Sequence, residues 1–124
     1  MINIIAHRIC PEYKSYSDAQ GMCETAAMNG FATGRLFEPH TQDFNDKVNV
    51  EAIDVFGWSN DAWIGINAKG GSWVYTSSGI ELEFENWESN YPGNQKDCAR
   101  FYSQSGKWIT YNCNYSRYFI CEFV

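Results

Sequence analysis

A stretch of ten residues, 88–97 (ESNYPGNQKD), carries most of the side chains in this sequence that suit ligand binding. It has almost no aliphatic residues and is rich in turn formers, which is typical of a long surface loop. Tyr91 offers an aromatic ring, and Asn94, Gln95 and Asp97 offer amide and carboxylate groups for hydrogen bonding. The loop therefore predicts non-covalent recognition of a ligand rather than a covalent reaction.

The side chains that commonly catalyse reactions do not occur here in a recognisable pattern. His7 and His40 are far apart in the sequence, and each is better explained as a structural or surface histidine. The sequence contains no nucleophile elbow, phosphate-binding loop or zinc motif. We therefore expect that the protein is not an enzyme.

The sequence contains five cysteines, and no two of them have the C-x-x-C spacing of a zinc or redox site. Disulfides are therefore the better interpretation. Because five is an odd number, one cysteine of a secreted chain remains as a free thiol or as half of an intermolecular bridge.

The composition is that of one globular domain with heavy use of aromatic residues. The chain has 124 residues, of which 44% are hydrophobic and 17% aromatic, so residues 1–124 can bury a core of their own. The net charge of −6 argues against binding to nucleic acid or to an anionic membrane surface. No apolar run approaches the roughly 18 residues of a membrane span, so we expect none.

The loop is expected to project from the stretch that precedes it, residues 63–87. This stretch opens with the dense apolar run Trp-Ile-Gly-Ile at 63–66, and glycine and serine clusters then divide it into short segments. Such a pattern is typical of short antiparallel strands joined by tight turns. Its large aromatic residues, which can each bury roughly 150–250 Å², place the core here.

The remaining elements can be predicted from periodicity and from residues that end helices and strands. Apolar residues three or four apart predict one helix from Ser17, as N-cap, to the stop at Asn29-Gly30, and a second over 41–56. A first strand ends at Pro11, which cannot donate a hydrogen bond to a neighbouring strand. Strands are predicted over 2–9, 98–102, 107–111 and 118–124. This order predicts an α+β fold.

The ordered set of motifs resembles the C-type lectin-like domain family over almost the whole chain, from about Ile4 to Phe123. Each motif alone is weak, but the order and the intervals together are specific. The matching segments are the cysteine-bearing helix 16–23, the Trp-Ile-Gly-Ile run 63–66, Gly79 to Trp87, Pro92, Asp97-Cys98, Gly106 to Trp108, Cys113 and Phe119 to Glu122. The resemblance implies two helices flanking antiparallel sheets, with a long ligand-binding loop.

The resemblance also implies how the cysteines pair. Cys23 would bond to Cys121, closing a loop of 98 residues, and Cys98 would bond to Cys113. Cys10 is then left over. Two alternatives follow for it: a disulfide to Cys10 of a second chain, giving a covalent homodimer, or a buried and inert thiol under the first helix.

Sugar-binding members of the family hold a calcium ion at the long loop, and the resemblance shows which positions here would hold it. At the position of the family's ligand tripeptide, this chain has Tyr91-Pro92-Gly93. Lys96 replaces the family's later glutamate, and Ile109-Thr110 replaces its Asn-Asp pair. Calcium needs about six to eight oxygen ligands, with carboxylates supplying the charge. We therefore expect no calcium at the long loop and no required cofactor.

A second calcium position of the family, which would be structural, has partial counterparts here. The main-chain oxygen of Phe37 and the carboxylates of Asp43 and Glu122 are similar to its ligands. The alternative is that Asp43 and Glu122 are ordinary surface acids.

Two functions from different classes follow. The first is a secreted, extracellular lectin that binds glycans or a glycoprotein surface without bridging calcium, because aromatic rings suit the apolar C–H faces of sugars. The second is a lectin-like domain that binds a protein partner and has no sugar activity.

The residues near the ligand face also have structural explanations. Any single tyrosine there can cover the core instead of touching a ligand, and Asp97 can hold the loop through backbone hydrogen bonds instead of binding a ligand. The predicted ligand-binding residues are Tyr91, Asn94, Gln95, Lys96, Asp97 and Tyr111.

Overall fold

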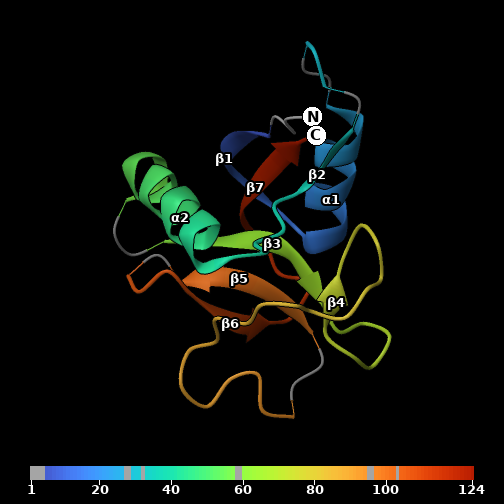
Figure 1. The fold of residues 1–124 in the computed structure, drawn as a ribbon, viewed down its shortest axis with the longest axis vertical. Helices are drawn as coiled ribbons and strands as arrows, with labels where there is room; N and C mark the ends of the chain where they lie inside the picture. Colours follow the sequence, from blue (N-terminus) through green and yellow to red (C-terminus); the bar gives the residue numbers. More distant parts are fainter. Residues whose placement is uncertain (1–4, 27–28, 32, 58–59, 95–96, 103) are drawn as a thin grey trace.

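The fold is one mixed β-sheet with two helices packed against it, as seen in the computed structural model of Figure 1. The structure describes residues 5–26, 29–31, 33–57, 60–94, 97–102 and 104–124. The α+β prediction is confirmed. The helices are α1 (Tyr16–Thr25) and α2 (Gln42–Phe56), and the strands are β1 (Ala6–Lys14), β2 (Gly34–Leu36), β3 (Asp61–Asn67), β4 (Val74–Tyr75), β5 (Cys98–Tyr102), β6 (Lys107–Tyr111) and β7 (Arg117–Phe123).

The sheet brings the two ends of the chain together and places β3 near its centre. The strand order is β1-β7-β3-β5-β6, with β2 also paired to β7 and β4 also paired to β3. Only the β3–β7 pairing is parallel among the described strands. Ala6 at the start of β1 lies opposite Phe123 at the end of β7. The Trp-Ile-Gly-Ile run therefore lies in the central strand, as its dense apolar pattern predicts.

The boundaries of β1 and α1 differ from the sequence prediction. β1 does not end at Pro11 but continues to Lys14, with an irregularity in its register after Cys10. Proline is tolerated there because β1 is an edge strand, where a missing backbone donor costs little. The first helix is capped by Ser15, whose hydroxyl accepts from the Asp18 backbone N–H, and not by Ser17. This helix ends at Thr25, earlier than predicted.

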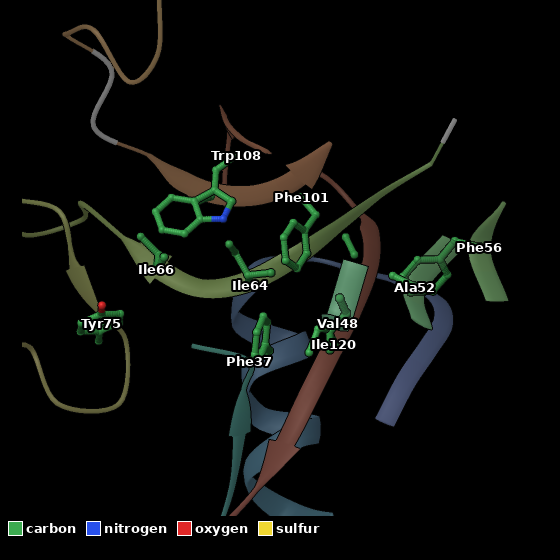
Figure 2. Packing of buried hydrophobic residues seen from close by; sticks show 12 residues of the cluster. Phe37, Val48, Ala52, Phe56, Ile64, Ile66, Tyr75, Phe101, Trp108 and Ile120 are labelled. Carbon is green, nitrogen blue, oxygen red and sulfur yellow. The ribbon is translucent and has the colours of Figure 1, made fainter. Parts of the chain in front are cut away.

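Apolar side chains form two core clusters. Figure 2 shows the larger one, in which Ile64 and Ile66 of β3 lie between Trp108 and Phe101 on one side and Phe37 on the other. α2 contributes to this cluster at four-residue spacing, through Val48, Ala52 and Phe56. The smaller cluster packs α1 against the sheet and comprises Tyr16, Ala19, Cys23, Leu36, Trp63, Cys98, Phe119, Cys121 and Phe123.

Gly65 is required where β3 passes the segment that follows β2. Its backbone N–H donates to the Phe37 carbonyl oxygen at 2.6 Å, and its carbonyl accepts from the Thr76 N–H at 2.8 Å. A Cβ atom added here would lie 2.6 Å from the Leu36 carbonyl oxygen and 2.7 Å from Cγ of Glu38. The first of these is a backbone atom that cannot rotate away, so only glycine fits.

Replacing Gly65 with alanine is expected to destabilise the protein by about 1–3 kcal/mol or more, since the strands must separate to admit the methyl group. Gly70→Ala is the matched control, because a Cβ there has no atom within 4 Å. Gly70→Ala is expected to be neutral or to stabilise by up to about 1 kcal/mol. Urea unfolding of both variants measures the difference, and equal stability of the two would contradict the close-approach argument.

Candidate ligand-binding face

Both disulfides predicted from the resemblance are present. Cys23 bonds to Cys121, which ties α1 to β7, and Cys98 bonds to Cys113, which ties the start of β5 to the turn after β6. The second bond lies directly after the long loop. It therefore fixes the point at which that loop returns to the sheet.

Hydrogen bonds to β6 and to the end of β3 hold the two ends of the long loop. Near its start, the Glu88 N–H donates to the Trp108 carbonyl and the Trp108 N–H donates to the Asn86 carbonyl, each at 2.9 Å. At its end, the Asp97 carbonyl accepts from the Ala68 N–H at 2.8 Å. The loop between them forms the lower edge of the molecule in Figure 1. Its conformation is thus set by strands that are themselves part of the core.

Trp108 is the buried anchor below this loop. Its ring is fully buried and makes edge contacts with Phe84 and Trp87. Its indole N–H donates to the Asn45 side-chain oxygen at 2.8 Å, and Asn45 in turn donates to the Gly106 carbonyl at 2.9 Å. A buried indole that keeps its hydrogen bond costs little to bury, so this contact joins α2 to β6 firmly.

The predicted loop residues differ in exposure. Asn94 is exposed, and Tyr91 and Asp97 are half-buried. One Asp97 carboxylate oxygen lies 3.8 Å from the Cys113 sulfur, so this side chain packs beside the disulfide. The predictions for Gln95 and Lys96 fall outside the described residues. Among the predicted ligand-binding residues in the described part of the loop, Asn94 is therefore the most exposed.

Tyr111 lies on β6 in a setting that the sequence did not reveal. The guanidinium carbons of Arg100 and Arg117 lie 4.0 and 4.4 Å from its ring centroid, and the Tyr115 ring lies 4.8 Å away. Cation–π contacts of this kind hold both arginines against the ring. Tyr111 thus positions two cations, and the more exposed ring beside it is Tyr115, which is 52% exposed.

Sequence reasoning missed Arg100, although the pattern contains a signal for it. On β5, Ala99 and Phe101 face the core, so the alternation of a strand puts Arg100 on the opposite face. There it forms an ion pair with Asp61 of β3. Burial raises the pKa of the Asp61 carboxyl and Arg100 opposes that rise, while burial lowers the pKa of the Arg100 guanidinium.

The second calcium position does not fit a calcium ion in the described residues. The Phe37 carbonyl already accepts from Gly65, and the buried Glu122 carboxylate accepts from Nε of Arg35 at 2.6 Å. Asp43 lies in the first turn of α2 and is exposed. Nowhere in the described part of the chain do three histidine, cysteine or acidic side chains gather as metal ligands. Arg35 supplies the positive charge that Glu122 requires.

Residues 12–123 match the family model described as the lectin C-type domain. The chain belongs to the C-type lectin domain family. This family consists of binding proteins, and the chain is not an enzyme. No helix in the described part of this lectin domain is long and apolar enough to cross a membrane.

Two relatives span most of this C-type lectin chain. Collectin-43 of Bos taurus is 30% identical over 118 residues, covering 89% of this chain and 33% of the relative. A snaclec of Gloydius halys that binds coagulation factor IX/factor X is 32% identical over 115 residues, covering 90% of this chain and 70% of the relative. The chain therefore spans about a third of the length of Collectin-43.

Solved structures support the fold at lower identity. The C-type lectin CEL-I from Cucumaria echinata superimposes with a TM-score of 0.86 at 16% identity, covering 100% of this chain and 93% of that chain. Human lithostathine superimposes with a TM-score of 0.82 at 22% identity, covering 99% of this chain and 85% of that chain. At these identities the likeness establishes the C-type lectin fold and no particular ligand.

Proposed function

We propose that residues 1–124 form a single secreted lectin domain that binds glycans through the face built by the long loop. The observation that carries this proposal is the loop itself, held at both ends by the sheet while Tyr91 and Asn94 remain accessible. A sugar presents apolar C–H faces to the Tyr91 ring and hydroxyl groups to the Asn94 amide. A mannose-binding protein of Gallus gallus is 37% identical over 83 residues, which supports a glycan as the ligand.

The proposed recognition does not use a bridging calcium ion. Tyr91, Gly93 and Ile109 stand where the family's ligands would be, and none of them has a carboxylate or amide side chain. Thr110, at the next such position, is only 4% exposed. Calcium requires about six to eight oxygens, so these positions favour direct contacts between sugar and protein.

Binding of the protein to immobilised glycans is expected to survive EDTA. Replacing Tyr91 or Asn94 with alanine is expected to weaken binding by about 1 kcal/mol each, or roughly fivefold in affinity, through loss of a ring contact or a hydrogen bond. Asn29→Ala, an exposed asparagine beyond α1, is the matched control and should bind like the parent protein. Loss of binding in EDTA, or full binding by both loop variants, would rule out this site.

The second candidate function is recognition of a protein partner without sugar activity. It is favoured by the snaclec relative, which is named for binding coagulation factors and matches 90% of this chain. A glycan array probed with and without EDTA separates the two functions. Binding to glycans both with and without EDTA supports the calcium-independent lectin. No glycan binding in either condition supports the protein-binding alternative.

We also propose that Cys10 joins two copies of the chain. Cys10 lies on the edge strand β1, opposite Phe119 of β7, and is half-buried. Its sulfur lies 3.8 Å from the Arg8 carbonyl oxygen, and burial raises the pKa of its thiol. An edge strand leaves one row of backbone groups available to a second chain. A two-fold dimer would also give a weak site avidity for a multivalent surface.

Non-reducing electrophoresis is expected to give a band at twice the monomer mass, because a two-fold axis beside β1 would bring two Cys10 thiols together. The band should disappear on reduction and in Cys10→Ser. A monomer band from the native protein, with one thiol that reacts only after unfolding, would identify Cys10 as buried and inert.

A further inference from the structure

A hollow of about 210 Å³ lies where the end of β1, the start of β3 and the start of β7 meet. It is lined by Tyr13, Asn60, Asp61 and Arg117. None of these residues belongs to the long loop. The hollow therefore shares no lining residue with the long loop, although the guanidinium of Arg117 lies over the Tyr111 ring.

Arg117 gives this hollow a cation that lacks a carboxylate partner among the described residues. One of its terminal nitrogens donates to the Ser116 carbonyl oxygen at 2.7 Å, and its guanidinium lies over the Tyr111 ring. A guanidinium has five N–H donors, so several remain for a ligand. The neighbouring Arg100 is already paired with Asp61. Two guanidinium groups thus face one carboxylate in a chain whose net charge is −6.

Asp61 gives the same hollow an acceptor that is not in use. One carboxylate oxygen pairs with Arg100, and the other is buried and has no hydrogen-bond partner among the described residues. Nε of Arg100 is likewise buried and without a described partner. Buried polar atoms are nearly always hydrogen-bonded in native proteins. Of these two residues only Asp61 lines the hollow, so its carboxylate is the group that a ligand bound there would complete.

Tyr13 gives the hollow a ring whose position is fixed. Its side chain is 58% exposed, and its ring stacks on Tyr118 at 4.5 Å between centroids. Tyr118 in turn stacks on Phe56 of the core at 4.6 Å. The exposed ring is therefore the outer member of a three-ring stack, which lowers the entropy cost of placing a ligand on it.

We propose that this hollow is a second binding site, which takes an acidic sugar, one that carries a carboxylate or a sulfate. The acidic group binds Arg117, since a guanidinium pairs with two oxygens of such an anion at once. A sugar hydroxyl donates to Asp61, and the apolar face of the sugar ring lies on Tyr13. A concave site with a ring, an acceptor and a cation fits a sugar better than a flat acidic peptide.

Nuclear magnetic resonance titration with methyl glucuronide, methyl glucoside and glucose 6-sulfate tests this assignment. The glucuronide differs from the glucoside only in its carboxylate, and the sulfate distinguishes the two kinds of acidic group. We expect shifts at the four lining residues with an acidic sugar, and binding about tenfold weaker for the neutral one, as for loss of a charged hydrogen bond. Added salt should weaken the acidic sugar only, because the contact is ionic.

Variants assign the effect to the hollow. Arg117→Gln is expected to reduce binding of the acidic sugar about tenfold, and Tyr13→Ala to reduce it several-fold. Arg8→Gln removes an exposed arginine at the other end of β1 and should bind like the parent protein. Thermal unfolding of each variant shows whether its fold is intact. Tyr91→Ala should leave this site unchanged, so failure of the loop site and failure of this site remain distinguishable.

Equal binding of the acidic and neutral sugars, or no binding of either, overturns the proposal. Unchanged affinity in a folded Arg117→Gln variant also overturns it. An aspartate-rich peptide serves as a further arm of the titration. If that peptide binds through Arg117 and the acidic sugars do not, the hollow is a contact for a protein and the sugar assignment is wrong.

Discussion

Replacing Arg35 with alanine is expected to lower the free energy of unfolding by about 3–5 kcal/mol at pH 7, the range for breaking a buried ion pair. Nε of Arg35 lies 2.6 Å from one Glu122 carboxylate oxygen and 3.9 Å from a Glu38 oxygen. The side chains of Glu122 and Glu38 are only 2% and 3% exposed. Without Arg35, the basic side chains that remain beside these carboxylates are histidines: His7 lies 3.9 Å from Glu122 and His40 lies 3.8 Å from Glu38.

The loss is expected to become smaller as the pH falls from 7 to about 5. Burial raises the pKa of Glu122 and Arg35 opposes that rise, so removal of Arg35 raises it further. A carboxyl whose pKa is higher in the folded than in the unfolded state binds protons preferentially when folded. As the pH falls through the folded pKa, this carboxyl takes up a proton and loses its buried charge. The Arg35→Ala variant therefore recovers part of the stability that it lacks at neutral pH.

Urea unfolding at both pH values measures this effect. Arg8→Ala is the matched control, because Arg8 is exposed and forms no ion pair among the described residues. Arg8 also contacts the Phe123 ring, so its loss is expected to cost up to about 1 kcal/mol, and equally at either pH. Adding Glu122→Gln to Arg35→Ala should recover part of the stability by removing one buried charge. A loss in Arg35→Ala that equals the control, or that grows on acidification, would contradict the role given to Arg35.

Removing the Cys23–Cys121 disulfide by the paired change Cys23→Ala and Cys121→Ala is expected to cost about 4–5 kcal/mol. The bond joins residues 98 positions apart and connects α1 to β7. A crosslink that closes so long a loop removes much of the conformational freedom of the unfolded chain. Both cysteines are also buried in the smaller core cluster, so their removal loses packing as well.

The Cys98–Cys113 bond provides the internal comparison. It joins residues only 15 positions apart, and its paired alanine variant is expected to lose about 3 kcal/mol. Thermal and urea unfolding of the two variants, each with its other disulfide verified by mass, measures the order. A larger loss for Cys98–Cys113 would mean that native packing, and not loop closure, governs these bonds.

The sequence alone determined the class of fold and most elements, because these depend on local patterns. Both disulfides were implied by the resemblance to the C-type lectin-like family. Val48, Ala52 and Phe56 recur every fourth residue and therefore form the buried face of a helix. Residues 98–102 and 107–111 have the aromatic-rich character of strands, and ten polar and turn-forming residues mark the loop between Trp87 and Cys98. Even so, a local signal failed at Pro11, because proline does not end a strand that lies at the edge of a sheet.

Apart from the paired cysteines, only the tertiary structure decided which distant side chains meet. Arg35 and Glu122 are 87 residues apart, and they pair because β2 and β7 are neighbours in register. The hollow at Tyr13, Asp61 and Arg117 likewise depends on three strands that meet at one place in the sheet. Periodicity tells which face of a strand is buried, but the partner and the register of that strand depend on the free energy of the whole packed chain. For this reason the sequence predicted the loop as a ligand site, whereas the buried charges and the hollow at Tyr13, Asp61 and Arg117 emerged only from the folded structure.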